Sequence, residues 1–419
     1  MTRRDRVMKA CAFEETDRVP MDLDGMASTG ISCFAYPRLV EALGLPPRPA
    51  RVYDTGQMLA MPELDVLDAL ECDVVTIHGH VTNAFEQEGV WKPYDFNGRL
   101  DAMVCDPDMF QTLEDGTIIQ PRHHVKMPPT SHVFEAEHGG QPFPLTGDLP
   151  KPDLEQIQED QESGGLSEED VKRITELCRR TREASDRAVF FGGPGAGIGV
   201  AGYGGIAIFP ILCLTEPDFV AELHELKIEH AIKQVRRLLP HIHPNIDVYL
   251  ISSDDWGTQS QTICPPSVYE QLFLPYYRRL NDAIHEIAPG VKTFLHSCGA
   301  IYDILDLVAD SAFDIVNPVQ WTAGGHSYTE WKDKARNRMT LWGGGVNAQA
   351  TLPLGTPQDV AREVKDIVAY MRQDGGFVFN AIHNILAEVA PENVIAMYRA
   401  AASVRRSAGP GSAGILSGT

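Results

Sequence analysis

Val291-Lys-Thr-Phe-Leu-His-Ser-Cys-Gly-Ala300 is an apolar, strand-like run that ends in an imidazole and a thiol two residues apart. Side chains at positions i and i+2 of an extended segment share a face, so His296 and Cys298 can converge on one point, as two ligands of a zinc ion must. The run therefore predicts a buried strand that carries half of a zinc site. A His-x-Cys pair is a short motif, and a buried histidine and cysteine without a metal fit the same residues.

Apolar, β-branched runs of this kind alternate with long amphipathic stretches along the chain. Several amphipathic stretches begin with a capping residue or a proline, as at Thr215-Glu-Pro217 and Thr356-Pro357, which is typical of helix starts. Strands and helices that alternate at this spacing indicate parallel βαβ units, and the predicted strands suffice for a closed α/β TIM (β/α)8 barrel over residues 1–402. The predicted strands are residues 18–25, 73–77, 188–193, 247–254, 291–296, 313–319, 340–346 and 376–382, and the predicted helices are residues 166–187, 216–239, 266–288, 299–310, 357–373 and 391–406.

Two regions interrupt this alternation. Residues 81–150 are rich in Pro, Gly and Asp and contain short alternating segments. We expect them to form a small antiparallel β insertion after the second strand, which serves as a lid or as the subunit contact of a homodimer. Residues 403–419 are dominated by Gly, Ser, Ala and Pro without apolar periodicity, which predicts a disordered tail.

Composition limits the classes of function. The 419 residues are 43% hydrophobic, enough to bury a large core. A net charge of -22 repels nucleic acid and anionic membrane surfaces. No apolar run approaches the roughly 18 residues of a membrane span, and no apolar stretch follows the basic N-terminus. The eight cysteines lie scattered without paired spacing, which suits reduced thiols. We therefore expect a cytoplasmic globular protein that binds neither nucleic acid nor membranes.

Polar side chains gather where the predicted strands end, which is where TIM barrels place their chemistry. Asp254 and Asp255 follow the fourth strand, His296 and Cys298 the fifth, and His383 the eighth. This ring favours a metal site. The alternatives are that an aspartate caps the next helix and that His383 bonds to a loop carbonyl. Further amides at the same edge are expected to bind substrate: Gln259, Gln320, Asn347 and Asn380.

A glycine-rich segment, residues 192–205, follows the third strand. It lacks the Lys-Ser/Thr pair of a nucleotide-binding P-loop and the glycine order of a dinucleotide-binding turn. We interpret it as a loop at the mouth of the barrel, whose small residues let a bulky ligand or partner approach.

Three motifs resemble the uroporphyrinogen decarboxylase superfamily. The run Gly376-Phe-Val-Phe-Asn-Ala-Ile-His-Asn-Ile-Leu-Ala-Glu-Val-Ala-Pro-Glu-Asn-Val394 is similar to the signature that follows its last barrel strand. His296-Ser-Cys-Gly-Ala300 is similar to the superfamily's fifth-strand motif, and Arg18-Val-Pro-Met-Asp22 to its N-terminal strand. The resemblance extends over about residues 15 to 402 and implies a TIM barrel.

The superfamily contains two chemistries. Its decarboxylases carry an Arg-Gln-Ala-Gly-Arg segment after the first strand, whose arginines hold the acidic side chains of the porphyrinogen. Here that segment reads Gly25-Met-Ala-Ser-Thr29, so the bidentate partners of those carboxylates are missing. The resemblance therefore implies the other branch, zinc-dependent methyltransferases that work with corrinoid cofactors.

In that branch the zinc ligands resemble His-x-Cys on the fifth strand plus a cysteine after the eighth. The last position falls on His383, so the implied ligands are His296, Cys298 and His383, a set that zinc accepts. The corrinoid-binding motif Asp-x-His-x-x-Gly does not occur in the chain, so the corrinoid would be supplied by a partner protein.

The expected reaction moves a methyl group between a small methoxyl, amine or thioether compound, or a thiol, and that corrinoid protein. Demethylation is slightly favoured. Asp254 or Asp255 would orient a zinc ligand or exchange a proton with the substrate. Two alternatives stay open: a metal-independent decarboxylase of a porphyrinogen or other carboxylate, and a non-catalytic barrel that binds a corrinoid protein or ligand.

Overall fold

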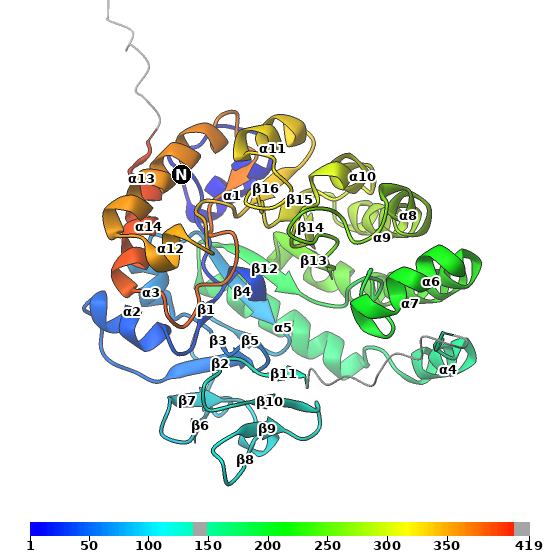
Figure 1. The fold of residues 1–419 in the computed structure, drawn as a ribbon, viewed down its shortest axis with the longest axis horizontal. Coiled ribbons are helices and arrows are strands. Elements are labelled where there is room, and N and C mark those ends of the chain that lie inside the picture. Colours follow the sequence, from blue (N-terminus) through cyan, green and yellow to red (C-terminus); the bar gives the residue numbers. More distant parts are fainter. Residues whose placement is uncertain (137–148, 406–419) are drawn as a thin grey trace, which may run out of the picture.

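The computed structural model describes residues 1–136 and 149–405 of the chain (Figure 1). Its largest sheet contains, in spatial order, β17 (Phe377–Val378), β16 (Thr340–Trp342), β15 (Ile315–Asn317), β14 (Lys292–His296), β13 (Val248–Ser253), β12 (Ala188–Gly192), β4 (Val74–His78) and β5 (Val81–Thr82). From β4 to β17 all neighbours are parallel, and β5 pairs antiparallel with β4. The sheet curls, with helices along its outer face (Figure 1), so the predicted α/β fold of TIM type is confirmed in its main features.

The two ends of the curled sheet are joined by an irregular segment. Residues 18–25 were expected to form the first barrel strand, but the structure places only isolated bridges there. Met21 pairs in parallel with Phe379 beyond the end of β17, and the carbonyl oxygen of Met21 accepts a 2.7 Å hydrogen bond from the Asp73 N–H, just before β4. Pro20 has no N–H to donate, which prevents a continuous ladder. The segment thus lies between β17 and β4 without being a regular strand.

Aromatic side chains fill the inside of the barrel. Phe190, Phe294 and Trp342 project inward from three strands and meet edge to face, with ring centroids 4.9 to 6.1 Å apart. Inward residues from alternate strands pack in layers in such barrels. The centre is therefore a packed core, and ligands are confined to its open ends.

The helices follow the predicted pattern with one break. They are α1 (Arg3–Cys11), α2 (Tyr36–Ala42), α3 (Leu64–Ala69), α4 (Leu154–Ser163), α5 (Glu168–Ala184), α6 (Phe209–Thr215), α7 (Pro217–Ile242), α8 (Pro266–Leu272), α9 (Leu274–Ile287), α10 (Leu305–Asp310), α11 (Tyr328–Ala335), α12 (Thr351–Leu354), α13 (Pro357–Met371) and α14 (Pro391–Ser403). The single helix predicted over 266–288 is wrong at Phe273, where α8 ends and α9 begins. Pro275 lacks the N–H that would continue the hydrogen bonds of α8.

Residues 81–136 contain short strands that form two small sheets. One has the order β1-β3-β2-β7-β6, and the other, β11-β10-β9-β8, is antiparallel throughout. Since the first sheet includes strands from residues 31–60, residues 81–136 do not form a separate insertion of their own. The strands of the two sheets are β1 (Ile31–Ser32), β2 (Ala50–Asp54), β3 (Leu59–Ala60), β6 (Lys92–Asp95), β7 (Asp101–Val104), β8 (Gln111–Thr112), β9 (Ile118–Gln120), β10 (Val125–Met127) and β11 (Glu135–Ala136). The role as a lid or subunit contact stays a prediction, and residues 137–148 lie outside the described residues.

The fold extends slightly past its predicted C-terminal limit. Ser403 is the last residue of α14, and Arg405 forms a bridge with Arg18. The rest of the predicted tail, residues 406–419, lies outside the described residues. In the part of the chain that the structure describes, no helix has the length and apolar character needed to cross a membrane.

Candidate metal centre

The β14 strand places two of the predicted ligands at the mouth of the barrel. His296 is its last residue and pairs with Ser253 of β13 and Asn317 of β15. The chain then turns sharply after Cys298. Gly299 has a φ of 86°, and a Cβ there would lie 2.2 Å from the carbonyl oxygen of Gly257, so this turn requires glycine.

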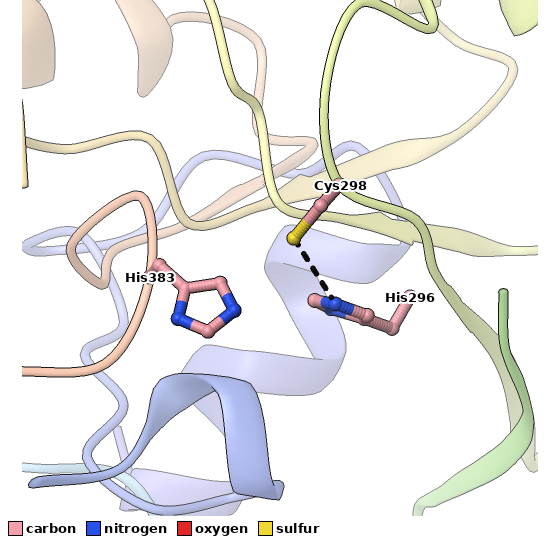
Figure 2. A group of neighbouring side chains, drawn as sticks. All are labelled: His296, Cys298 and His383. Atoms are coloured by element: carbon pink, nitrogen blue, oxygen red, sulfur yellow. Dashed lines mark hydrogen bonds between the residues drawn. The ribbon is translucent and has the colours of Figure 1, made fainter. Parts of the chain in front are cut away.

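His383, from the loop after β17, completes a cluster with these two residues. The ligand atoms of His296, Cys298 and His383 all lie within 4.8 Å of one another. His296 Nε2 and Cys298 Sγ are 3.3 Å apart, and the two imidazole centroids are 5.9 Å apart. Figure 2 shows both rings and the thiol directed toward a common space. His383 lies 87 residues after His296 and 85 after Cys298, so only the fold brings it to them.

Asn317 fixes the orientation of His296. Its Nδ2 donates to the Trp342 carbonyl oxygen at 2.9 Å, which leaves Oδ1 to accept from His296 Nδ1 at 2.6 Å. Because Nδ1 faces Asn317, the ring directs Nε2 toward the cluster. A hydrogen-bonded outer partner of this kind is usual for a metal-binding histidine.

The charges of the site differ between the two histidines. Burial alone would lower the pKa of His296, but the neighbouring Cys298 and Asp255 raise it to about 10. Burial and the charge of His296 lower the pKa of His383 to about 4. Within the described residues, the His383 ring makes no hydrogen bond. It therefore offers a neutral imidazole, the form that binds a metal.

Two imidazoles and a thiolate form a donor set that suits zinc. Zinc bonds to nitrogen and sulfur are about 2.0–2.3 Å long, so ligand atoms separated by 3.3 to 4.8 Å can reach one ion after small side-chain movements. Three protein ligands leave a fourth position for a substrate or water. The residues therefore fit the predicted ion.

The two predicted acidic residues occupy different environments. The Asp255 side chain is 56% exposed, and its Oδ1 accepts from the Cys298 N–H at 2.8 Å and lies 3.4 Å from His296 Nε2. Burial would raise the pKa of Asp255, but the hydrogen bond and charge of His296 lower it to about 2. Asp255 is thus an ionised group at the cluster.

Asp254 is buried, and its hydrogen-bond partners are not the ligand residues. Its carboxylate accepts hydrogen bonds from the Val200 N–H, Trp256 Nε1 and the Tyr277 hydroxyl at 2.6 to 3.2 Å. Burial raises the pKa of Asp254 to about 7. These contacts link the glycine-rich loop to β13, so of the two aspartates only Asp255 directly contacts the cluster.

Among the described residues, no hydrogen bond joins the four predicted substrate-binding amides to the ligand atoms of the cluster. Gln320 Oε1 accepts from the Gly299 N–H at 2.7 Å and so supports the turn after Cys298. Asn347 Oδ1 accepts from the N–H groups of two residues just before α12, and Asn380 donates to the carbonyl oxygens of Asp22 and Thr29. Gln259 is exposed. A substrate role for these four residues stays a prediction.

Sequence reasoning missed two residues that touch His296. One is Asn317, whose position at a strand end was a usable signal. The other is Ser28, whose hydroxyl lies 3.2 Å from His296 Nε2. Ser28 lies in the segment Gly25–Thr29, and the sequence indicated only that this segment lacks the arginines of the decarboxylases.

The model of the family described as "Uroporphyrinogen decarboxylase (URO-D)" matches residues 137–404, more than half of the chain. The chain belongs to the uroporphyrinogen decarboxylase family. It is 29% identical over 237 residues to a uroporphyrinogen decarboxylase of Syntrophotalea carbinolica, a match that covers 54% of this chain and 63% of that relative. It is 22% identical over 248 residues to chloroplastic uroporphyrinogen decarboxylase 2 of Arabidopsis thaliana, with 57% and 59% covered. The matched part thus spans less than two thirds of either relative.

One solved structure shares the fold over almost the whole chain. It is described as a methyltransferase from Methanosarcina mazei, with a TM-score of 0.56, 16% sequence identity, and 96% of this chain and 98% of that chain covered. At this identity the match supports the family's fold. Membership of this family indicates an enzyme.

Proposed function

We propose that this protein is a zinc-dependent methyltransferase, which moves a methyl group between a small methylated compound or thiol and a corrinoid carried by a partner protein. Demethylation is the favoured direction. The observation that carries the proposal is the His296, Cys298 and His383 cluster, whose ligand atoms lie within 4.8 Å at the carboxyl end of β14. Porphyrinogen decarboxylation gives no reason for a thiol and two imidazoles to converge.

The surroundings of the cluster also argue against a porphyrinogen substrate. Ser28 contacts His296 from the segment Gly25–Thr29, where the family's decarboxylases carry arginines. The cluster's exposed charge is the Asp255 carboxylate, which repels a polycarboxylate. Metal-independent decarboxylation is the second candidate function, because the relatives with similar sequences are named as decarboxylases.

The residues at the cluster would have separate roles in the reaction. Zinc held by the three ligands would polarise an ether oxygen or hold a thiol as its thiolate. Asn317 fixes the ring of His296, and Asp255 holds the Cys298 backbone through its N–H. Asp255 is ionised at neutral pH because its pKa is about 2. It can therefore accept a hydrogen bond from the substrate but cannot serve as a proton donor there.

Metal analysis combined with a methyl-transfer assay tests the proposal. Purified protein should carry about one zinc, and with a reduced corrinoid protein and a methyl donor it should form methylcobamide, seen as a change in the visible spectrum. Donors should include methoxylated aromatics, methylamines and methyl thioethers. Decarboxylation of uroporphyrinogen by metal-free protein would overturn the proposal.

His383 offers a sharper test, since its position holds cysteine in the methyltransferase branch. His383→Ala should lose zinc affinity, whereas His383→Cys should retain the metal because a thiolate also binds zinc. If His383→Ala kept zinc at wild-type affinity and lost only turnover, His383 would be an acid or base and not a ligand. The corrinoid partner, the homodimer and the cytoplasmic location stay predictions from sequence.

A further inference from the structure

A cavity lies beside the metal centre, under the glycine-rich loop that the sequence alone left without a specific role. Its volume is about 520 Å³, in the range of small-molecule sites. The loop residues from Gly193 to Gly202 form one wall, the end of β13 with Ser253 and Asp255 forms another, and Lys227 of α7 completes the lining. Because Asp255 also contacts His296 and Cys298, this cavity adjoins the cluster.

Close packing holds the loop in place over β13. A Cβ at Gly195 would lie 2.5 Å from the Ile251 carbonyl oxygen, and one at Gly199 would lie 2.8 Å from Asp254 Oδ1. The Ala196 N–H donates to the Ile251 carbonyl at 2.8 Å. Glycine is therefore needed at two positions to let the loop approach, and the cavity wall is built into the fold.

Lys227 is the cationic side chain of this cavity. Its Nζ donates to the Gly197 carbonyl oxygen at 2.8 Å, and no described carboxylate forms an ion pair with it. An ammonium group has three N–H donors, so two remain. The N–H groups of Gly195, Gly197 and Gly199 also make no hydrogen bond among the described residues. The lining thus includes a cation with unused donors and glycines whose N–H groups have no partner among the described residues, a combination that suits an anion.

We propose that this cavity binds the methylated substrate, and that the substrate is a small carboxylic acid whose carboxylate lies on Lys227. The inference rests on the proposed function and names its substrate class. One ammonium group balances one negative charge, whereas a dianion would place excess charge in a cavity that Asp254 and Asp255 also line. Asp255 lines the same cavity and contacts His296 and Cys298, so a molecule whose carboxylate lies on Lys227 can direct its methyl group toward these two residues.

Binding measured by calorimetry, without a corrinoid protein, tests this assignment. The probes are methoxyacetate, 3-methoxybenzoate and 4-methoxybenzoate, each compared with its uncharged amide, on zinc-loaded and metal-free protein. We expect at least one acid to bind more tightly than its amide. Lys227→Gln should weaken binding of that acid roughly tenfold or more, because a hydrogen bond to a charged group is lost, and should leave the amide unchanged.

Two variants separate charge from folding. Lys227→Arg keeps a cation and should retain most of the preference for the acid. Lys233→Gln, on the same helix but exposed, should bind like wild type. Equal binding of acids and amides by wild type, unchanged acid binding by Lys227→Gln, or no binding of any acid would each overturn the inference.

The two proposals fail in different ways. Methyl transfer by a zinc protein that does not distinguish acids from amides would overturn the cavity assignment alone. Binding of an acid through Lys227 by a protein that holds no zinc and transfers no methyl group would overturn the proposed function alone.

Discussion

The charged side chains at the two ends of the barrel differ in whether they are paired. At the base, Asp73 is fully buried and accepts hydrogen bonds from Arg6, Arg18 and the Met21 N–H at 2.6 to 3.0 Å. At the mouth, Lys227 has no ionic partner among the described residues, and the Asp255 side chain is 56% exposed. Buried charges must be paired to be tolerated. The unpaired Lys227 and the exposed Asp255 at the mouth are therefore available to a substrate or a metal, whereas the buried, paired charges at the base are committed to the fold.

The largest expected effect on function comes from the mouth. His296→Ala and Cys298→Ser should each lose zinc, measured by elemental analysis, and lower turnover roughly a thousandfold or more, because the metal's contribution to charge stabilisation is several kcal/mol. Their circular dichroism and metal-free melting should match those of wild type. Cys105→Ser, at another partly exposed cysteine, is the control and should keep its zinc. Full zinc occupancy in both ligand variants would refute the ligand assignment.

The largest expected effect on stability comes from the base. Asp73→Ala leaves Arg6 and Arg18 buried without their shared carboxylate, which should lower the free energy of unfolding by about 3–5 kcal/mol in urea titrations. The folded variant should still bind one zinc. Glu14→Ala breaks the exposed pair with Lys9 and should change stability little. If Asp73→Ala instead removed zinc from a stable protein, the division between the two ends would be wrong.

Asn317 lies between these extremes, since it is buried but acts on the site. Asn317→Ala removes the acceptor for His296 Nδ1 and should weaken zinc affinity 10- to 100-fold, measured by competition with a chelator. Asn281→Ala, at a buried asparagine that bonds to the Ser311 carbonyl, should reduce stability without changing zinc affinity. Equal zinc affinity in both variants would mean that Asn317 has only a structural role.

The same contrast explains which features sequence could predict. The strands after residue 70 were predictable because buried apolar runs alternate with amphipathic helices, and His296 and Cys298 because two residues on one strand face share a direction. The irregular segment 18–25 was not predictable. Its apolar residues suggest a strand, but Pro20 lacks the N–H that a regular strand needs. Only the folded structure shows that Met21 pairs with Phe379 and bonds to Asp73 before β4.

Contacts between distant segments were also beyond the sequence. Ser28 contacts His296 across 268 residues, and a serine in a short 3-10 turn carries no signal of that contact. Lys227 lies on an amphipathic helix with other lysines, so the sequence did not distinguish it from a solvent-exposed residue. Only the fold of the glycine-rich loop over β13 gives it a cavity to line.

The smallest expected effect tests whether charge at the base is really committed to the fold. Lys332 is 3% exposed and donates to the Gly375 carbonyl oxygen. Burial, reinforced by Arg336 and opposed by Asp374 and Asp333, lowers the pKa of Lys332 to about 8. Between this value and its ordinary pKa near 10.5, the unfolded chain binds more protons than the folded one, so Lys332 makes the free energy of unfolding rise with pH.

A comparison of wild type with Lys332→Met isolates this contribution. From pH 8 to 9, the free energy of unfolding of wild type should gain about 1 kcal/mol relative to the variant, measured by urea titration at each pH. Lys365→Met, at an exposed lysine of α13, should follow wild type throughout. Parallel curves for wild type and Lys332→Met would mean that the Lys332 ammonium is stabilised at the base as fully as it is in water. Burial against a carbonyl oxygen would then suffice to hold a cation there, and pairing with carboxylates would no longer distinguish the base from the mouth.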